Sequence, residues 1–386
     1  MEQSIIGANL RRVREAKGLS QAQLAELAGI SRVAYRNIEN GSATPKVSTL
    51  QNIADGVGVK LQDLLVPVRT LKRVRFRASK KMYSRESIIN EVAKWLDDFN
   101  DLEKLLNEHK EYRFENLAQK LSTLNAGHER AKKAAEEARK ILKLNDKEPI
   151  RDIAGLLESA GIKVSPISLA SDGFFGLSVA KEEGGPAIIV NVWDRISVER
   201  CIFSAAHELG HLLLHLDTYD VDEISESEDQ ESEANVFASY FLMPDKAFKS
   251  EWNDTYGLPF IDRVFKVKLI FQVSYKTVLY RLSQIPGKNS GKWVWGKFQS
   301  DYKRKTGKTL SIVDEPEALH PDKFLHVPEV LRSQEPHSIS SSHFVEDRLH
   351  RLVRHAIEKE EITMSRGAEI LKMDLEAMRD MVSSWI

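Results

Sequence analysis

Cysteine is nearly absent from this sequence of 386 residues, in which Cys201 is the single example. One thiol excludes an intramolecular disulfide and a metal cluster held by several cysteines, and it fits a reducing compartment. Residues 1–7 lack the basic and apolar segments of a secretory signal. No uncharged apolar run approaches the roughly 18 residues that a membrane span needs. We therefore expect a cytoplasmic protein without a membrane partner.

Acidic residues are scarce at the N-terminus, although the whole chain carries a net charge of only −1. Residues 1–83 hold 15 lysines and arginines against 6 acidic residues, a local charge of +9. Residues 217–233 show the reverse, with 9 acidic residues and no basic one. A basic N-terminal region of this kind can meet an anionic polymer.

The patterning predicts a mainly α fold with a small β-sheet (α+β) and more than one domain. Short apolar runs at 162–164, 174–180 and 187–192 are typical of strands, whereas most other segments have helical spacing. We divide the chain into an N-terminal helical domain (1–66), a basic linker (67–84), a helical connector (85–145), a domain with a metal motif (146–285) and a C-terminal region with a helical tail (286–386).

Two short helices are expected within the first domain. Ser20 and Ser31 are good N-caps, and the helices that they begin would end near residues 28 and 38. Gly29 can take a left-handed backbone at the turn between them. Two short helices joined in this way form a helix-turn-helix. Its core is expected to contain Leu24, Ala28, Ile30, Ala34 and Ile38.

The stretch 19–41 resembles the XRE (Cro/cI-type) helix-turn-helix family through Ser20-Gln21, Leu24-Ala25, Gly29-Ile30-Ser31 and Ile38-Glu39-Asn40-Gly41. The resemblance implies five helices, a homodimer and a double-stranded DNA operator, with the second helix in the major groove. It also implies a phosphate contact for Gln21. The side chains expected to face the bases are Arg32, Val33, Tyr35 and Arg36.

Arginine can pair with guanine through two hydrogen bonds, and Val33 can contact a thymine methyl group. The other interpretation is a helix-turn-helix that serves only protein contacts. The basic linker favours DNA, although basic runs are also common as solvated surface.

A second motif, His207-Glu208-Leu209-Gly210-His211, has the H-E-x-x-H pattern. Residues four apart share a helix face, so the two imidazoles can hold one Zn²⁺ while Glu208 points at the water on the metal. Glu208 would then act as general base and general acid in peptide hydrolysis. The apolar flanks predict a buried helix at about 198–214. Burial of two histidines and a glutamate in such a helix is costly unless they have polar partners or bind a metal. Histidines satisfied within a core are the other interpretation.

A catalytic zinc has three protein ligands, so a third one is expected from a later helix. Glu231 and Glu233 are both candidates. The surroundings are similar to the ImmA/IrrE family of metallopeptidases, and this resemblance implies that Glu231 is the ligand. It rests on the run from His207 to His215, on Glu231-x-x-Ala234-Asn235-x-Phe237-Ala238 and Leu242-Met243-Pro244, and upstream on Gly161-Ile162-x-Val164 and Ile189-x-Asn191.

Further residues near the motif have open roles. Asn235 is expected to orient a metal ligand. His215 either supports a ligand, helps to bind an oxyanion or is an exposed histidine at a helix end. Cys201 is interpreted as a core residue. The acidic loop 217–230 is interpreted as solvated surface, with a cover over the cleft or a partner of the basic linker as alternatives.

Two functional hypotheses follow. In the first, the protein is a DNA-binding transcriptional regulator with a zinc endopeptidase domain that cleaves a repressor or another partner protein, as the ImmA/IrrE resemblance implies. In the second, a non-enzymatic regulator uses the metal domain to sense a ligand or to bind a partner such as a toxin. Mn²⁺ remains an alternative to Zn²⁺, because ligand type alone discriminates poorly. The tail resembles a second short helix-turn-helix, with Ser365 and Asp374 as the expected N-caps of its two helices. Its second helix carries Glu376 and Asp380 with only Arg379 basic, so we interpret the tail as a protein-contact or dimerisation module.

Overall fold

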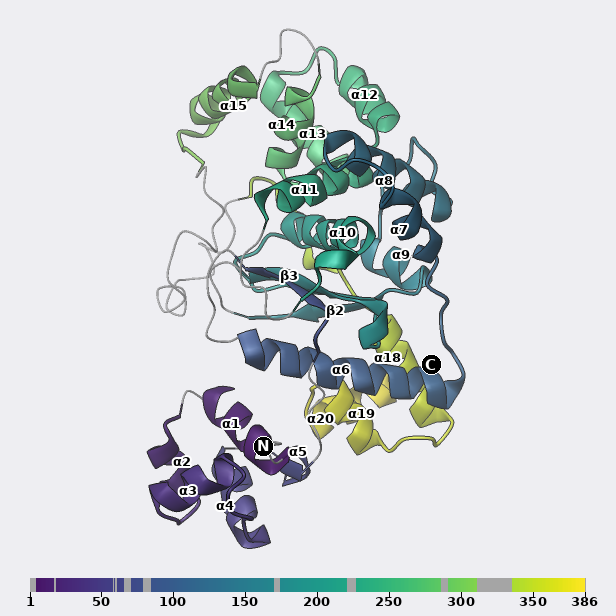
Figure 1. Ribbon diagram of the computed structural model, residues 1–386. Coiled ribbons are helices and arrows are strands. Elements are labelled where there is room, and N and C mark those ends of the chain that lie inside the picture. The colour runs from purple at the N-terminus through teal and green to yellow at the C-terminus, as the bar shows by residue number, and fades with distance from the viewer. Residues whose placement is uncertain are drawn as a thin grey trace. The chain divides into compact units, whose positions relative to one another are not determined.

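The computed structural model describes residues 5–16, 19–57, 59, 61–65, 71–78, 85–169, 174–220, 227–285, 291–310 and 335–385. The chain forms two compact units, Met1–Leu71 with Met82–Phe99, and Lys72–Lys81 with Asn100–Ile386. The fold is mainly helical with one four-stranded sheet, as predicted (Figure 1). Within the described ranges, no helix combines the length and the apolar character that crossing a membrane requires.

The N-terminal helices of the first unit confirm the helix-turn-helix. Ser20 caps its helix through a reciprocal pair, because its hydroxyl accepts from the Gln23 N–H and the Gln23 side chain accepts from the Ser20 N–H. Ser31 caps the next helix, and Gly29 has a φ of +67° at the turn. The five helices are α1 (Ile5–Ala16), α2 (Gln21–Leu27), α3 (Arg32–Glu39), α4 (Val47–Val57) and α5 (Leu61–Leu65).

The predicted core of this bundle is largely confirmed. Leu24, Ala28 and Ile38 are buried, while Ile30 and Ala34 are half-buried. Apolar residues from α1, α4 and α5 complete it, among them Leu10, Leu50, Ile53 and Leu64.

A four-stranded sheet organises the second unit. Its strand order is β1-β3-β4-β2, formed by β1 (Val74–Ala78), β3 (Phe174–Val179), β4 (Ala187–Asn191) and β2 (Lys163–Ile167). β3 pairs antiparallel with both of its neighbours, and β2 pairs parallel with β4. Strands β2, β3 and β4 are those that the apolar runs in the sequence predicted.

β1 differs from the expectation for residues 67–84. We expected a linker there because the segment is basic and begins with a proline, but residues 74–78 form an edge strand of the sheet. Edge strands tolerate charged side chains, so a basic composition does not exclude a strand. The neighbouring residues 66–70 and 79–84 lie outside the described part of the chain.

Helices cover the sheet and carry the metal motif. α10 (Val198–Leu214) lies along the sheet, and α11 (Glu228–Leu242) packs between α10 and α8 (Figure 1). The expected connector is helical, with α6 (Arg85–Leu106), α7 (Glu115–Leu121) and α8 (His128–Ile141), and the boundary between the two units falls inside α6. The short helix α9 (Ile153–Ser159) precedes β2.

The remaining elements complete the second unit. Ser338 and the backbone around it bind Glu199 of α10. The tail is helical as expected, and Asp374 caps its last helix, although Thr363 rather than Ser365 caps the helix before it. The elements of the second unit not yet given are η1 (Lys181–Glu183), η2 (Leu216–Thr218), α12 (Asp245–Asp254), α13 (Phe260–Phe271), α14 (Tyr275–Ser283), α15 (Gly291–Thr306), η4 (Ser341–His343), α18 (Arg348–Glu358), α19 (Met364–Ile370) and α20 (Leu375–Ser383).

Candidate metal centre and DNA-binding surface

Helix α10 places the H-E-x-x-H residues inside the protein. The helix begins after Ser197, whose hydroxyl accepts a hydrogen bond from the Arg200 N–H. His207, Glu208 and His211 are each 0% exposed. Since residues 207 and 211 are one turn apart, their imidazoles reach toward the same point.

Glu231, in the first turn of α11, meets both imidazoles. The Nε2 atoms of His207 and His211 are 2.9 Å apart. Oε2 of Glu231 lies 3.2 Å from His207 Nε2, and Oε1 lies 3.0 Å from His211 Nε2. Bonds of about 2.0–2.2 Å in a tetrahedral zinc site put the donor atoms about 3.3 Å apart. The three side chains therefore fit a cation of that size, and they are a group of metal-ligand type in the described chain.

The protonation states of this group suit a cation. Burial, with a smaller contribution from His207, lowers the pKa of His211 well below its usual value, so the imidazole is neutral. Burial alone would raise the pKa of Glu231, but hydrogen bonds from the two histidines outweigh it and hold this pKa far below its usual range. A neutral imidazole and a charged carboxylate are the forms of these groups that bind a metal.

The other ring nitrogens are held by neighbouring side chains. His207 Nδ1 lies 2.9 Å from Asn235 Oδ1, and His211 Nδ1 lies 2.9 Å from His215 Nδ1. His215 is 4% exposed, so it is not an exposed histidine at a helix end. Partners of this kind fix the orientation and the tautomer of a metal-binding imidazole.

Glu233 faces away from the two Nε2 atoms. Its Oε2 lies 3.0 Å from His215 Nε2, and its Oε1 accepts hydrogen bonds from the Arg130 side chain and from the Gly127 N–H. A residue two positions along a helix points to another face, which is why Glu231 and not Glu233 joins His207. The geometry separates the two alternatives that the sequence left open.

Glu208 is linked to two residues that the sequence analysis missed, directly to Ser178 and through Ser178 to Tyr219. The Ser178 hydroxyl, on β3, donates to Glu208 Oε2 at 2.7 Å, and the Tyr219 hydroxyl lies 2.8 Å from Ser178 Oγ. Burial raises the pKa of Tyr219 well above its usual value, so the phenol keeps its proton. Ser178 and Tyr219 have no motif spacing to Glu208, so only the fold brings them to it.

Arg75 of β1 is the third residue that the sequence did not reveal. Its guanidinium donates to Glu231 Oε1 at 3.1 Å, to Gln230 Oε1 at 2.6 Å and to Thr218 Oγ1 at 3.2 Å. A cation thus touches the carboxylate that faces the two histidines. Among the described residues, this contact joins the basic segment to the acidic stretch 217–233.

Cys201 is a core residue, as expected. It is buried, and its thiol lies 3.5 Å from the Asn191 carbonyl. Burial raises the pKa of the Cys201 thiol to about 12. A thiol in this state is unreactive, so Cys201 takes no part in the candidate chemistry.

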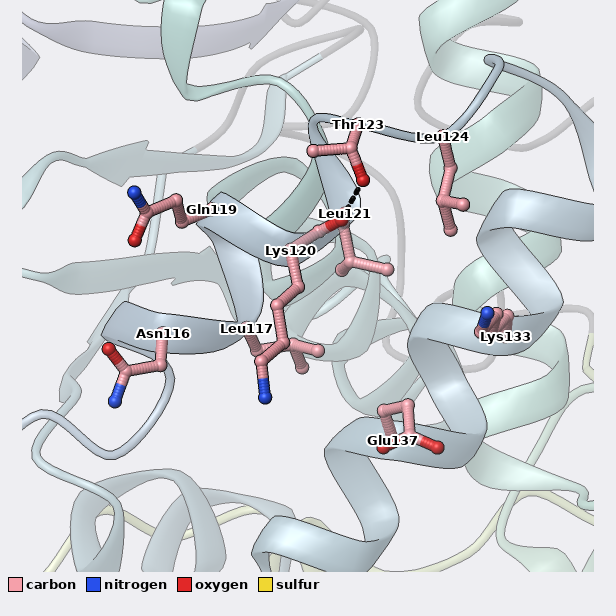
Figure 2. Close-up of a pocket in the computed structure, with 9 residues that line it drawn as sticks. All are labelled: Asn116, Leu117, Gln119, Lys120, Leu121, Thr123, Leu124, Lys133 and Glu137. Carbon is pink, nitrogen blue, oxygen red and sulfur yellow. Dashed lines mark hydrogen bonds between the residues drawn. The ribbon is translucent and has the colours of Figure 1, made fainter.

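A surface hollow lies apart from the metal group. Figure 2 shows it between α7 and α8. Its volume is about 570 Å³. Leu117, Leu121 and Leu124 form its apolar wall, and Lys120 and Lys133 are among its polar residues. None of the residues that line it belongs to α10 or α11.

The exposed face of α3 agrees with the expected DNA-contacting residues except at one position. Arg32 and Arg36 are exposed, and Val33 is 69% exposed. Tyr35 is 0% exposed, so the expectation that it faces the bases is wrong. Tyr35 shares a helix face with Ile38, three residues on, and this face packs into the bundle.

Gln21 makes a contact that the sequence did not predict. Its side chain donates to Glu39 Oε1 at 3.1 Å, and Arg14 donates to the same carboxylate at 2.8 and 3.0 Å. Burial would raise the pKa of Glu39, but hydrogen bonds from Arg14, Gln21 and Tyr35 lower it, so the carboxylate is charged. Gln21 is half-buried and keeps part of its side chain at the surface.

Two family models match this chain. A helix-turn-helix model matches residues 10–64, and a model of the IrrE N-terminal-like domain, a peptidase family, matches residues 157–283. These ranges contain α3 and the metal group respectively. Fold and site together define a DNA-binding regulator with a domain of the zincin-like metallopeptidase type.

Curated relatives agree with the first match. An uncharacterized HTH-type transcriptional regulator, y4dJ of Sinorhizobium fredii, is 33% identical over 16% of this chain and 82% of its own length. YqaE of Bacillus subtilis, with the same description, is 35% identical over 21% of this chain and 70% of its own length. The immunity repressor of Bacillus phage phi105 is 27% identical over 26% of this chain and 65% of its own length. This chain belongs to the HTH-type transcriptional regulators and carries an IrrE-like domain.

The relatives cover different shares of this chain. PuuR of Escherichia coli, another HTH-type transcriptional regulator, is 37% identical, but the chain spans only 31% of its length. Each of these alignments covers about a quarter of this chain or less.

Proposed function

We propose that this regulator binds operator DNA through α3 and that its IrrE-like domain is a zinc-dependent endopeptidase that cleaves a repressor or another partner protein. The observation that carries the proposal is the convergence of His207, His211 and Glu231 beside the buried Glu208. Two imidazoles and a carboxylate lie within 3.2 Å of one another in this buried group, an arrangement that suits a metal cation.

The chemistry assigned to this chain is peptide-bond hydrolysis. A zinc ion held by His207, His211 and Glu231 would supply a Lewis acid for the scissile carbonyl and would lower the pKa of water toward about 7. Glu208 accepts one proton of the attacking water as the new C–O bond forms, and it delivers that proton to the amine nitrogen as the C–N bond breaks. Ser178 donates to Glu208 Oε2 and so fixes the orientation of this carboxylate. Asn235 and His215 hold the two imidazoles.

The first test is elemental analysis of metal per chain after purification in metal-replete medium. We expect about one zinc per chain in the native protein and none in His207→Ala. His343→Ala is the control, because this histidine is exposed and lies outside the metal group. Manganese in place of zinc would change the metal but keep the site. No metal in any of these proteins would overturn the peptidase assignment.

The second test concerns cleavage. We expect new protein N-termini in cells that express the native protein, and none in cells that express Glu208→Gln, which keeps the ligands. Glu228→Gln is the matched control, because this glutamate is exposed at the start of α11. Identical N-termini with and without Glu208 would remove the enzyme from the proposal.

The third test concerns the DNA-binding surface. Arg36→Ala is expected to weaken binding to the operator by about 1–3 kcal/mol if the guanidinium reads a guanine. Arg304→Ala is the control, since this arginine is exposed on α15. Footprinting on the chain's own promoter region measures both, and the spacing of two protected half-sites tests the proposed homodimer. Equal protection by the two variants would exclude Arg36 as a base contact.

Arg75 gives support to a second candidate, a regulator without peptidase activity. A guanidinium on Glu231 at 3.1 Å competes with a metal for this carboxylate. In this alternative the domain senses a ligand or holds a partner protein such as a toxin. Footprints that do not change with a zinc chelator, together with unchanged protein N-termini, would favour it.

A further inference from the structure

Strand β3 lies along the proposed general base. Its Ser178 donates to Glu208, and a Cβ built on Gly176 would lie 3.3 Å from Glu208 Oε1. One edge of β3 pairs with β4. An extended peptide on the opposite edge would therefore run past Glu208 with its backbone beside the metal group.

The chain's own strand β1 occupies that edge. It pairs antiparallel, with Arg75 opposite Ser178 and Arg77 opposite Gly176. The pairing continues beyond the strand, because the Ala180 N–H donates to the Arg73 carbonyl. β1 therefore pairs with Ser178 and Gly176, the two β3 residues described above as adjoining Glu208.

β1 is also held by segments outside the sheet. Arg75 donates to Glu231, Gln230 and Thr218, and the Arg73 guanidinium donates to the Leu216 carbonyl at 3.0 Å. These acceptors belong to η2 and to the first turn of α11. β1 thus joins β3 to the segment that carries the third proposed ligand.

We propose that β1 is an internal inhibitor of the metal site. It occupies the edge of β3 where an extended protein segment, with a basic residue at the place of Arg75, binds before cleavage. This inference rests on the proposed peptidase function. The residues before and after this segment, up to Leu71 and from Met82, belong to the DNA-binding unit.

Amide hydrogen exchange tests whether β1 occupies the edge of β3, and it does not require peptidase activity. Arg75→Ala removes the anchor to Glu231, and Arg73→Ala removes the anchor to Leu216 without touching a proposed ligand. In both variants, the amides of residues 174–179 should exchange at least tenfold faster than in the native protein. Arg304→Ala should leave them unchanged. Unchanged exchange of β3 in both anchor variants would overturn the proposal.

A binding measurement tests the same edge directly. The probe is a fluorescein-labelled peptide with the sequence of residues 71–81, and a scrambled peptide of equal charge is the control. In a Glu208→Gln background, which keeps the peptide intact, we expect at least tenfold tighter binding to Arg73→Ala than to the protein with both anchors. The assignment of the β3 edge as the binding site would be refuted if both proteins bind the peptide equally well. It would also be refuted if the scrambled peptide gains as much affinity for Arg73→Ala.

Cleavage separates the two proposals. Fluorescein-labelled casein should be cut at least tenfold faster by Arg73→Ala than by native protein, and not at all by Arg73→Ala with Glu208→Gln. Faster β3 exchange and peptide binding without any cleavage would overturn the peptidase function and the inhibitory role while leaving β1 as a displaceable strand. Cleavage by all variants at one rate, with metal bound, would keep the peptidase and overturn the inhibition.

Discussion

The hydrogen-bonded chain behind His211 gives the sharpest quantitative prediction. It runs from His211 through His215 and Glu233 to Arg130, with His211–His215 and His215–Glu233 separations of 2.9 and 3.0 Å. In Glu233→Gln the side chain keeps its size but loses its charge. The His215 imidazole then loses its anionic partner, and its hold on the His211 tautomer weakens.

The expected loss of zinc affinity in Glu233→Gln can be bounded from the position of Glu233 in this series of contacts. A residue that orients a metal-binding imidazole contributes about 10–100-fold to metal affinity, which equals about 1.4–2.7 kcal/mol. Glu233 lies one residue further from the metal than His215, so the loss should fall near the lower limit. Glu231→Gln removes a proposed ligand and should lose more. Asn235→Ala acts directly on the His207 imidazole and should therefore give a larger loss than Glu233→Gln.

The assay is a competition between the protein and a fluorescent zinc chelator at pH 7, which gives the zinc Kd of each variant. Glu228→Gln serves as the control, because it changes the same residue type in the exposed first turn of α11. Thermal unfolding of the apo proteins identifies a loss of fold, since removing Glu233 also leaves the Arg130 charge without this carboxylate. A Kd for Glu233→Gln within twofold of the native value, with the fold intact, would refute the role of this chain of contacts.

Three further predictions concern stability and packing. Tyr35→Ala should destabilise the helix-turn-helix by about 3–5 kcal/mol, as large buried aromatic residues do, and so lower its urea midpoint, whereas Arg36→Ala should leave that midpoint unchanged. Burial, and then Glu346 and Asp347, raise the pKa of Glu158 to about 9. Stability from this proton is complete below the usual pKa of 4.5 and is lost as the pH rises toward 9, so Glu158→Gln should flatten the fall of Tm over that range. A Cβ at Gly210 would lie 3.0 Å from Phe237 of α11. Gly210→Ala should therefore weaken zinc binding several-fold in the chelator assay, although alanine favours a helix by about 1 kcal/mol; an unchanged Kd would show that the two helices can separate without cost.

Local signals in the sequence predicted most of the elements around the site. The helix expected at about 198–214 is α10 (Val198–Leu214), because Ser197 caps it and apolar residues line it throughout. The caps Ser20 and Ser31 begin α2 and α3 for the same reason. Such features depend on residues within four positions of one another, and this is the range over which a helix forms its contacts.

Contacts between segments that are distant in the sequence could not be predicted from such local signals. Ser178 reaches Glu208 over 30 positions of the chain and Tyr219 over 41, and Arg75 reaches Glu231 over 156. Tyr35 shows a different failure. It is expected from the sequence to face the bases, but its position on the helix directs the ring into the bundle, where the hydroxyl lies near the Leu10 carbonyl.

The misjudged linker shows which signal should have carried more weight. The absence of acids in 67–83 predicted a solvated segment, yet Val74-Arg75-Phe76-Arg77 alternates apolar and basic residues, which is the two-residue period of a half-buried strand. The acidic stretch 217–233 offers a reason for the charge, because Glu231 accepts from Arg75. A basic segment and an acidic segment in one chain are therefore better interpreted together. Charge alone cannot distinguish a linker from an edge strand, whereas alternation can.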